Sequence, residues 1–388
     1  MPGTSDVQSV CHVVQLSPEG RGAIASILVS GPQATELVAR CFNANSGCQL
    51  DKTPTGQMVF GRWQHTGNQL QEEVVVFQRQ DQEIEIHCHG GHKATESICQ
   101  TMQAAGCQLI SWRQWLKLTG ETIQLQARAA LADACTERTS RILLDQYNGA
   151  LAAAVADILN ELRCQNLDKS RQKISDLLKR VELGRHLVCP WRVVLVGQTN
   201  VGKSSLVNAL VGFPRSIVYD QPGTTRDALT AITAMAGWPL ELIDTAGLRE
   251  TNDPIEVAGI QRTRDTIETA ALVLVVFDAT SLWSDENKMF VESLGRSIVV
   301  INKIDLCDDD DTSRHRQWPL NAICTSANLG TGIDLLVVQI TERLVGEPPA
   351  VGAAVPFHES HFAALREAAD AVDSGDCSQA ERVLSLLS

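Results

Sequence analysis

Hydrophobic and polar positions change their spacing along the chain and divide it into parts. In residues 1–118, the helical spacing of 33–41 and 92–105 predicts two helices. Four short runs rich in β-branched residues predict strands, at 10–18, 23–31, 72–80 and 83–91. We therefore expect an N-terminal α+β domain.

Residues 119–189 contain no proline and are rich in Ala, Leu, Gln and Arg. Apolar residues at helical spacing predict one amphipathic helix through Leu151, Val155, Ile158 and Leu162. They predict a second helix through Ile174, Leu177, Leu178 and Val181. The tail 357–388 is again helical in pattern, so it is expected to complete a helical domain with 119–189.

Between these helical parts, residues 190–347 alternate apolar strands with helical segments. The strand runs are RVVLVG, LELID, ALVLVVFDA, SIVVINK and ICTSA, and one helix is expected to start at Lys203. Strands that are apolar throughout are typical of a parallel sheet covered on both faces. A linker rich in Pro and Gly within 348–388 leads from this part to the last helices.

Composition and charge restrict the class of protein and its expected location. The 388 residues are 44% apolar and 20% charged, which indicates a folded globular protein. The net charge of −13 argues against non-specific binding of nucleic acid over the whole surface. The 12 cysteines form no C-x-x-C pair, and no apolar run is long enough to span a membrane. We expect a cytoplasmic protein without a membrane partner.

The segment from Gly197 to Ser204, GQTNVGKS, matches the phosphate-binding pattern G-x-x-x-x-G-K-[ST] between a strand and a helix. Its backbone N–H groups are expected to surround the phosphates, Lys203 to add positive charge, and Ser204 to bind Mg²⁺. The loop residues assigned to the nucleotide are Asn200, Val201, Gly202, Lys203, Ser204 and Ser205.

A second motif, NKID, selects the base. The Asp305 carboxylate can accept two N–H donors from guanine, which adenine does not offer. With Asn302 and Lys303 it forms the predicted guanine site, and a third loop is expected to close over the base through Ser326, Ala327 and Asn328. The predicted ligands are therefore GTP and GDP, and we call residues 190–347 the G domain.

Two further segments complete this set. The DTAG segment ends a strand and is expected to face Mg²⁺ and the γ-phosphate through Asp244, Thr245, Ala246 and Gly247. In the preceding segment GTTRD, Thr225 is the expected second Mg²⁺ ligand, and Thr224 also faces the nucleotide. Leu248 follows DTAG where many GTPases place a water-orienting Gln, so other groups must orient water and neutralise charge.

The segments GQTNVGKSSLVNAL, YDQPGTTRDAL and DTAGLRETNDPIEVAGIQR resemble the MnmE/TrmE family of tRNA-modification GTPases. The resemblance implies that K⁺ is held by Asn200 and by the loop atoms of Tyr219, Gln221 and Thr224. It also implies that Glu256 orients the attacking water. Arg249 and Lys203 are the other catalytic candidates.

The resemblance extends outside the G domain, through SPEGRGAIASILVSGP and EIEIHCHGGH. It implies a homodimer formed by the N-terminal domain, a flavoprotein partner, and modification of the wobble uridine of tRNA.

The chain departs from this family at the folate contacts. Family members bind a folate through an Arg, a Glu and a Lys; this chain has Leu28, Glu85 and Leu131 at those positions. Each lost charge-assisted contact weakens the binding free energy by about 1.5–3 kcal/mol. We therefore expect weak or absent folate binding. The C-terminal Cys motif of the family is also missing, and the nearest cysteine, Cys377, is predicted to lie in a loop.

His87, Cys88, His89 and His92 could suggest a metal site. His87 and His89 share one face of a strand without a third ligand at suitable spacing, so a structural role is favoured.

We therefore predict an α/β protein in which a P-loop GTPase domain is inserted into a helical domain that follows an N-terminal α+β domain. Three roles stay open: a K⁺-stimulated GTPase of tRNA modification, a regulatory or assembly switch acting on ribosomal RNA or a protein, and a degenerate paralogue.

Overall fold

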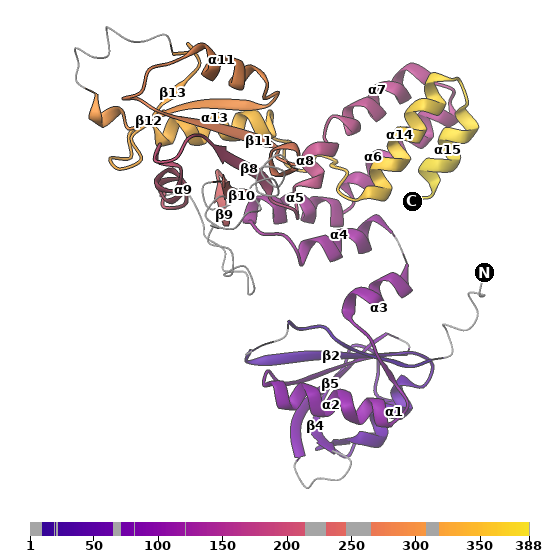
Figure 1. The fold of residues 1–388 in the computed structure, drawn as a ribbon. Coiled ribbons are helices and arrows are strands. Elements are labelled where there is room, and N and C mark those ends of the chain that lie inside the picture. Colours follow the sequence, from indigo (N-terminus) through magenta and orange to yellow (C-terminus); the bar gives the residue numbers. More distant parts are fainter. Residues whose placement is uncertain are drawn as a thin grey trace. The chain divides into compact units, whose positions relative to one another are not determined.

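The computed structural model describes residues 10–18, 20, 22–64, 71–80, 82–120, 122–213, 230–245, 265–307 and 318–387. The chain forms two compact units, Met1–Glu121 and Thr122–Ser388 (Figure 1). Each unit has its own hydrophobic core. The expected fold class is confirmed: a P-loop GTPase domain lies within a helical domain, and an α+β domain precedes them. The boundaries at residues 189 and 347 stay predictions.

The first unit is built on a seven-stranded sheet with the order β3-β4-β5-β6-β2-β1-β7. Its strands are β1 (His12–Gln15), β2 (Ile24–Ser30), β3 (Phe42–Ala44), β4 (Met58–Gln64), β5 (Gln71–Gln80), β6 (Glu83–His89) and β7 (Gln108–Leu109). Its helices are α1 (Ala34–Cys41), η2 (Leu50–Lys52), α2 (His92–Ala104) and α3 (Trp112–Thr119). All strand pairs are antiparallel except β1 with β7.

Alternation along β2 explains why α1 and α2 cover one face of this sheet. Ala25, Ile27 and Val29 point into the core, where they join Leu37 of α1 and Ile98 of α2. The four predicted strands and both predicted helices are confirmed. The strand β4 was missed because two of its outward positions, Met58 and Phe60, are also apolar, which obscures the period of two.

The second unit begins with helices. These are α4 (Ile123–Leu131), α5 (Glu137–Tyr147), α6 (Ala150–Arg163), α7 (Leu167–Leu178) and α8 (Val181–Arg185). The apolar stripe predicted for 151–162 is buried along α6, as expected. The second predicted helix is shorter than expected, because Val181 starts α8 instead of ending α7.

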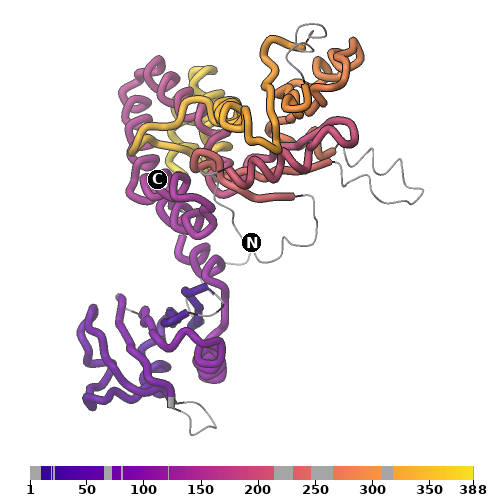
Figure 2. Tube along the Cα trace, turned by 90° about the vertical axis from the view of Figure 1, so that its left-hand side faces the viewer, coloured from indigo at the N-terminus to yellow at the C-terminus, as the bar shows by residue number. Residues whose placement is uncertain are grey.

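The C-terminal helices α14 (Glu359–Asp373) and α15 (Cys377–Ser385) return to pack beside α6 and α7 (Figures 1 and 2). Ion pairs join the two sets: Arg163 Nε lies 2.6 Å from Glu381 Oε1, and Arg171 Nε lies 2.7 Å from Asp373 Oδ1. The loop predicted around Cys377 is wrong, because Asp376 caps α15 and Cys377 is its first residue.

The G domain contributes a six-stranded sheet with the order β13-β12-β11-β8-β10-β9. Its elements are β8 (Trp191–Val196), α9 (Lys203–Val211), β9 (Thr230–Met235), β10 (Trp238–Asp244), β11 (Leu272–Asp278), α11 (Asp285–Glu292), β12 (Ser297–Asn302), η4 (Ile304–Leu306), β13 (Ile323–Cys324) and α13 (Ile333–Val345). The predicted parallel arrangement holds except at β9, which forms an antiparallel hairpin with β10. Apolar residues of α9 and α13 cover one face, and the partly buried Val291 of α11 packs on the other.

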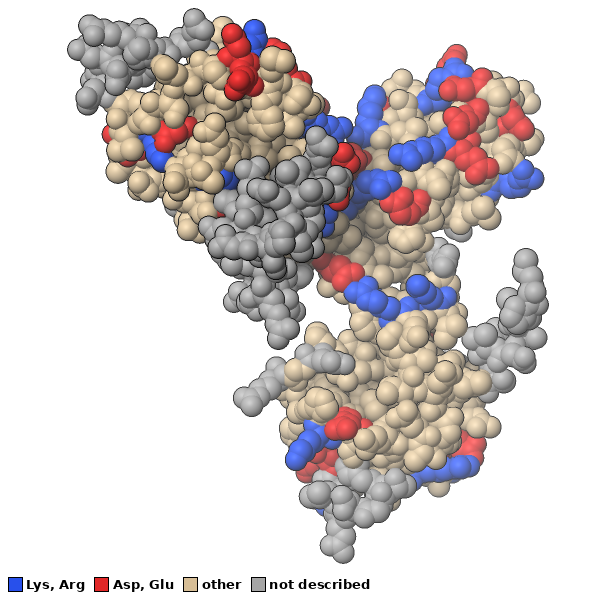
Figure 3. All heavy atoms as spheres, in the orientation of Figure 1, with Lys and Arg blue, Asp and Glu red and all other residues tan. Residues whose placement is uncertain are grey.

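Charged residues are mixed in sign on the visible surface of the helices (Figure 3). Lys173, for example, lies 2.8 Å from both Asp157 and Glu161. This face of the helices is therefore not a uniformly basic patch of the kind that binds nucleic acid non-specifically. Among the described residues, no single helix has the length and apolar character needed to cross a membrane, and one bent pair, α5 with α6, meets those criteria together.

Candidate functional site

The phosphate-binding loop follows β8 and ends where α9 begins. Gly197 has φ of +153°, and a Cβ atom there would lie 2.3 Å from the Val276 carbonyl oxygen. Gly202 has φ of +92°, and a Cβ atom there would lie 2.4 Å from Asn302 Nδ2. Both positions therefore require glycine, which lets the loop backbone pass close to neighbouring strands and turn its N–H groups inward.

Lys203 is buried, and its side chain folds back over this loop. Its Nζ donates to the carbonyl oxygens of Gly197 at 3.0 Å and Gln198 at 2.8 Å. The ammonium group is thereby held beside the loop at the first turn of α9, where the helix dipole also favours an anion.

Ser204 and Asp244 bring two oxygen ligands together. Ser204 Oγ donates to Asp244 Oδ2 at 2.5 Å, and Asp244 lies at the end of β10. The next residue, Thr245, is anchored by its hydroxyl to the Leu195 carbonyl oxygen at 2.8 Å. A hydroxyl beside a carboxylate fits the oxygen ligands that Mg²⁺ prefers, so this pair suits the metal that accompanies GTP.

Asn302 connects the predicted base site to the phosphate loop. Its side chain is 1% exposed, and Nδ2 donates to the Val201 carbonyl oxygen at 3.0 Å. Its Oδ1 accepts from Ala327 N at 3.1 Å and from Thr325 Oγ1 at 3.2 Å. One buried amide therefore joins three loops that are far apart in the sequence.

Lys303 makes a second connection. It adopts φ of +66°, and its Nζ donates to the Asn200 carbonyl oxygen at 2.5 Å. The same Nζ lies 2.8 Å from Asp278 Oδ2. Burial acts to raise the pKa of the Asp278 carboxyl group, but hydrogen bonds from Lys303 and Thr280 outweigh it and lower that pKa.

Several predicted residues lie near these connections at the surface. Asn200, Asp305 and Asn328 are exposed, as are Ser204 and Ser205 in the first turn of α9. Ser326 is buried, and its Oγ accepts from Leu329 N at 3.2 Å. Other predicted residues lie outside the described part of the chain: Tyr219, Gln221, Thr224, Thr225, Ala246, Gly247, Arg249 and Glu256.

Comparison with known proteins decides the family. Residues 192–303 match the family described as 50S ribosome-binding GTPase, and residues 13–111 match the family described as GTP-binding protein TrmE N-terminus. The tRNA modification GTPase MnmE of Geobacillus thermodenitrificans is 31% identical over 402 residues, covering 92% of this chain and 87% of the relative. The chain belongs to the MnmE/TrmE family.

Another member of this family, the tRNA modification GTPase MnmE of Heliobacterium modesticaldum, is 31% identical over 415 residues, covering 92% of this chain and 89% of the relative. Among solved structures, that of Aquifex aeolicus Era is 27% identical over 46% of this chain and 66% of that chain, with a TM-score of 0.31. As an MnmE/TrmE member with a GTPase domain, the chain is a GTP-hydrolysing enzyme that uses Mg²⁺.

Two of the positions that contact folate in the MnmE/TrmE family, 28 and 85, lie in the first unit, where their surroundings are described. Leu28 is fully buried opposite Glu85 in the pairing of β2 with β6. Glu85 Oε1 accepts from Arg79 Nη1 at 3.1 Å, and Glu85 Oε2 lies 3.6 Å from His87 Nε2. The carboxylate is thus engaged within the protein and Leu28 offers no charge, so these residues do not fit the family's folate contacts.

The histidines of β6 have partners of their own. His87 Nδ1 lies 2.9 Å from Ser26 Oγ, and His89 Nδ1 lies 2.6 Å from Glu72 Oε1. Within the described ranges, no group of three or more His, Cys, Asp or Glu residues is placed to hold a metal ion.

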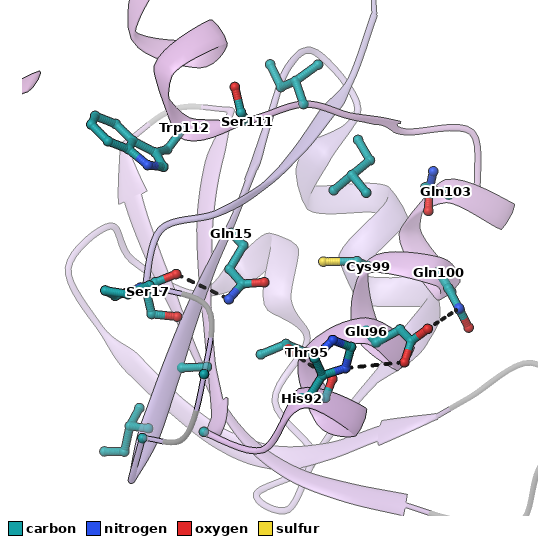
Figure 4. Close-up of a pocket in the computed structure, with 18 residues that line it drawn as sticks. Gln15, Ser17, His92, Thr95, Glu96, Cys99, Gln100, Gln103, Ser111 and Trp112 are labelled. Carbon is teal, nitrogen blue, oxygen red and sulfur yellow. Dashed lines mark hydrogen bonds and ion pairs between the residues drawn. The ribbon is translucent and has the colours of Figure 1, made fainter. Parts of the chain in front are cut away.

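The first unit also contains a cavity of about 850 Å³ that the sequence did not predict (Figure 4). Gln15 and Ser17 line it from one side, and Thr95, Glu96 and Gln100 of α2 line it from another. Glu96 accepts from Gln100 at 3.2 Å, and Gln15 donates to the Ser17 carbonyl oxygen at 3.2 Å. Neither folate position, 28 or 85, lines this cavity.

Proposed function

We propose that this chain is a K⁺-stimulated GTPase that acts in the modification of tRNA. The observation that carries the proposal is the set of contacts made by Asn302 and Lys303, which join the guanine-selecting loop to the phosphate loop. Relatives that share 31% identity over 92% of this chain are tRNA modification GTPases.

The phosphate end of the site binds and orients GTP. Lys203, which is held over the loop, and the N–H groups of residues 200–205 would hold the phosphates. Ser204, with Thr225, would hold Mg²⁺, which when bound would neutralise charge on the β- and γ-phosphates. In the proposed reaction water attacks the γ-phosphorus, the bond to the β–γ bridging oxygen breaks, and GDP and inorganic phosphate leave.

Water positioning is assigned to Glu256 from the match to the MnmE/TrmE family, since the residue after DTAG, Leu248, is apolar and cannot orient water. Arg249 is the other candidate in that segment. The Glu256→Ala variant is expected to reduce single-turnover hydrolysis by at least about 100-fold, a typical effect for a positioned general base. Unchanged hydrolysis with retained K⁺ stimulation would show that another group orients the water.

The role of K⁺ rests on Asn200. It is exposed, lies in the left-handed region at φ of +64°, and its carbonyl oxygen accepts a hydrogen bond from Lys303 Nζ, so its side-chain amide is free of the burial that would exclude an ion. With Tyr219, Gln221 and Thr224, it would supply the oxygen ligands. Hydrolysis measured in KCl and NaCl at equal ionic strength tests this, and equal rates would contradict it.

The base preference is the first measurement to make. Calorimetry in magnesium buffer should show binding of GDP and none of comparable strength for ADP, because Asp305 accepts two donors that only guanine presents. Equal affinity for GDP and ADP would remove the basis of the whole proposal.

A homodimer and a flavoprotein partner are part of the proposal. The face of the first sheet opposite α1 and α2 exposes Met58 and Phe60, which are 68% and 47% exposed. Exposed apolar side chains on this face of the sheet would be buried if a second copy of the chain packed against it. Sedimentation of the protein, and of the Met58→Glu variant, would test dimer formation.

One observation favours a second role, a switch that binds RNA or protein without modification chemistry. Leu28 and Leu131 occupy positions where the family carries charged folate contacts, and Leu131 packs against the core of the second unit. Wobble uridine measured in tRNA from a deletion strain distinguishes the two roles. Unaltered uridine modification would favour the switch.

A further inference from the structure

Lys303 lies between two loops and is held in place by Asp278. Its Nζ contacts the Asn200 carbonyl oxygen at 2.5 Å on one side and Asp278 Oδ2 at 2.8 Å on the other. The Lys303 and Asp278 side chains are 28% and 16% exposed, so the pair is shielded from much of the solvent. Shielding strengthens such an ion pair compared with one on an open surface.

Asp278 is itself fixed on three sides. Its Oδ1 accepts from the backbone N–H of Thr280 at 2.9 Å and from Thr280 Oγ1 at 2.7 Å. It ends β11 in register with Asn302, and Ala279 N donates to the Asn302 carbonyl oxygen at 2.8 Å. With Oδ1 occupied in this turn, Oδ2 is left to face Lys303.

The backbone conformation of Lys303 is strained and needs the contacts that its side chain makes with Asp278 and Asn200. A φ of +66° is uncommon for a residue with a Cβ atom and costs about 1 kcal/mol. Strain of this kind persists only where neighbouring groups hold the conformation, and such positions are concentrated at binding sites.

We infer that Asp278 is a positioning residue for nucleotide binding: its carboxylate holds Lys303 so that the guanine-selecting loop and the phosphate loop stay aligned. The inference rests on the proposed function, because Asp305 lies two residues after Lys303 and Asn200 lies in the phosphate loop. Asp278 lies in neither the phosphate loop nor the guanine motif, so in this proposal it acts through Lys303.

The test uses the full chain and GDP binding measured by calorimetry in magnesium buffer. Asp278→Asn keeps the size of the side chain and can still accept from Thr280, but it presents N–H donors to the Lys303 ammonium. We expect GDP affinity to fall by about tenfold, the scale of a lost charge-assisted contact. The KM for GTP should rise more than kcat falls.

A double-mutant cycle separates positioning from general loss of structure. If Asp278 acts through Lys303, the double variant Asp278→Asn with Lys303→Met binds GDP as weakly as Lys303→Met alone. Additive losses in the double variant would overturn the inference. Asp278→Ser, which can keep the hydrogen bond from Thr280 N, replaces Asp278→Asn if that variant does not fold.

Thr280→Val is the matched control. It removes the Thr280 hydroxyl group from Oδ1 and leaves Oδ2 facing Lys303, so its GDP affinity should stay within about twofold of wild type. A loss as large as that of Asp278→Asn would assign the effect to the turn at 278–280 and overturn the inference. If the wild-type chain itself does not prefer GDP over ADP, the proposed function fails; if it does and Asp278→Asn binds normally, only the positioning role fails.

Discussion

At the scale of single residues, Asn302 shows how one buried amide organises a site. Its donor and acceptor groups are matched to a carbonyl oxygen of the phosphate loop and to donors of the third loop. Because the side chain is 1% exposed, water cannot replace a lost partner, and an unmatched group here costs about 1–3 kcal/mol.

The Asn302→Asp variant should therefore weaken both stability and nucleotide binding. It has the same shape, but a carboxylate oxygen would face the Val201 carbonyl oxygen in place of the N–H donor. We expect the free energy of unfolding to fall by about 2–4 kcal/mol, measured by urea denaturation, together with weaker GDP binding. Thr325→Val, which removes one hydroxyl donor, should cost about 1 kcal/mol; equal costs for both variants would contradict this reasoning.

His361 is a second residue with a defined chemical state. It is fully buried, its Nδ1 accepts from Phe357 N at 3.4 Å, and its Nε2 lies 2.6 Å from Gln126 Oε1. The ring is therefore neutral and donates through Nε2. Burial, with a smaller contribution from His358, lowers the pKa of His361 to about 3.

This pKa predicts loss of stability in acid. The unfolded chain has the ordinary histidine pKa of about 6.5, so below that pH it binds a proton that folded His361 does not. His361 should thus reduce the free energy of unfolding as pH falls from about 6.5 towards 3, by at most ~1.4 kcal/mol per pH unit. The His361→Gln variant, compared by urea denaturation, should have a shallower pH dependence; identical slopes would show that the folded histidine titrates normally.

At the scale of elements, the β9–β10 hairpin is set by its turn. Met235 pairs with Trp238, which leaves a two-residue loop of Ala236 and Gly237 with φ of +49° and +82°. Two positive φ values are typical of a type I′ turn, which matches the twist of the strands. A Cβ atom at Gly237 would also lie 3.1 Å from Arg138 Cβ of α5, so the turn packs against the helical domain.

Substitutions at these neighbouring positions should act in opposite directions. Ala236→Asn is expected to raise the free energy of unfolding by about 0.5–1 kcal/mol, because Asn tolerates the left-handed region better than Ala. Gly237→Ala is expected to lower it by about 1–2 kcal/mol, because it adds strain and crowds Arg138. Changes of the same sign in thermal or urea unfolding would refute the assigned turn.

At the scale of the second unit, the chain leaves the helical domain after α8 and returns through the segment before α14. Gln146 binds this segment through both atoms of its side-chain amide: Nε2 donates to the Ala353 carbonyl oxygen at 3.1 Å, and Oε1 accepts from Val355 N at 3.0 Å. Arg180 donates to the Ala354 carbonyl oxygen at 2.8 Å. The segment that enters the G domain and the segment that leaves it are thus held together by hydrogen bonds within the helical domain.

Gly184 of α8 lies where these two segments approach each other closely. A Cβ atom there would lie 1.6 Å from the Pro356 carbonyl oxygen, which is backbone and cannot rotate away. Gly184→Ala should therefore lower the free energy of unfolding by about 2–4 kcal/mol, measured by urea denaturation. Gly295→Ala, where a Cβ atom would meet nothing within 4 Å, is the control and should be nearly neutral.

Local signals made much of this protein predictable from its sequence. The strand before Gly197, the helix from Lys203 and the buried stripe of α6 depend on residues that are close together in the chain, so their spacing specified them. The phosphate and guanine motifs were recognisable for the same reason, because the residues of each motif are nearly consecutive in the chain.

Only the tertiary structure decided which distant groups meet. The support of Lys303 by Asp278, the cavity of the first unit and the contact of Gly184 with Pro356 all join segments that are separated in sequence. Hydrophobic spacing says which face of an element is buried, but not which neighbour covers it. That choice follows from packing the whole unit, because burial is non-directional whereas hydrogen bonds and ion pairs need a specific partner.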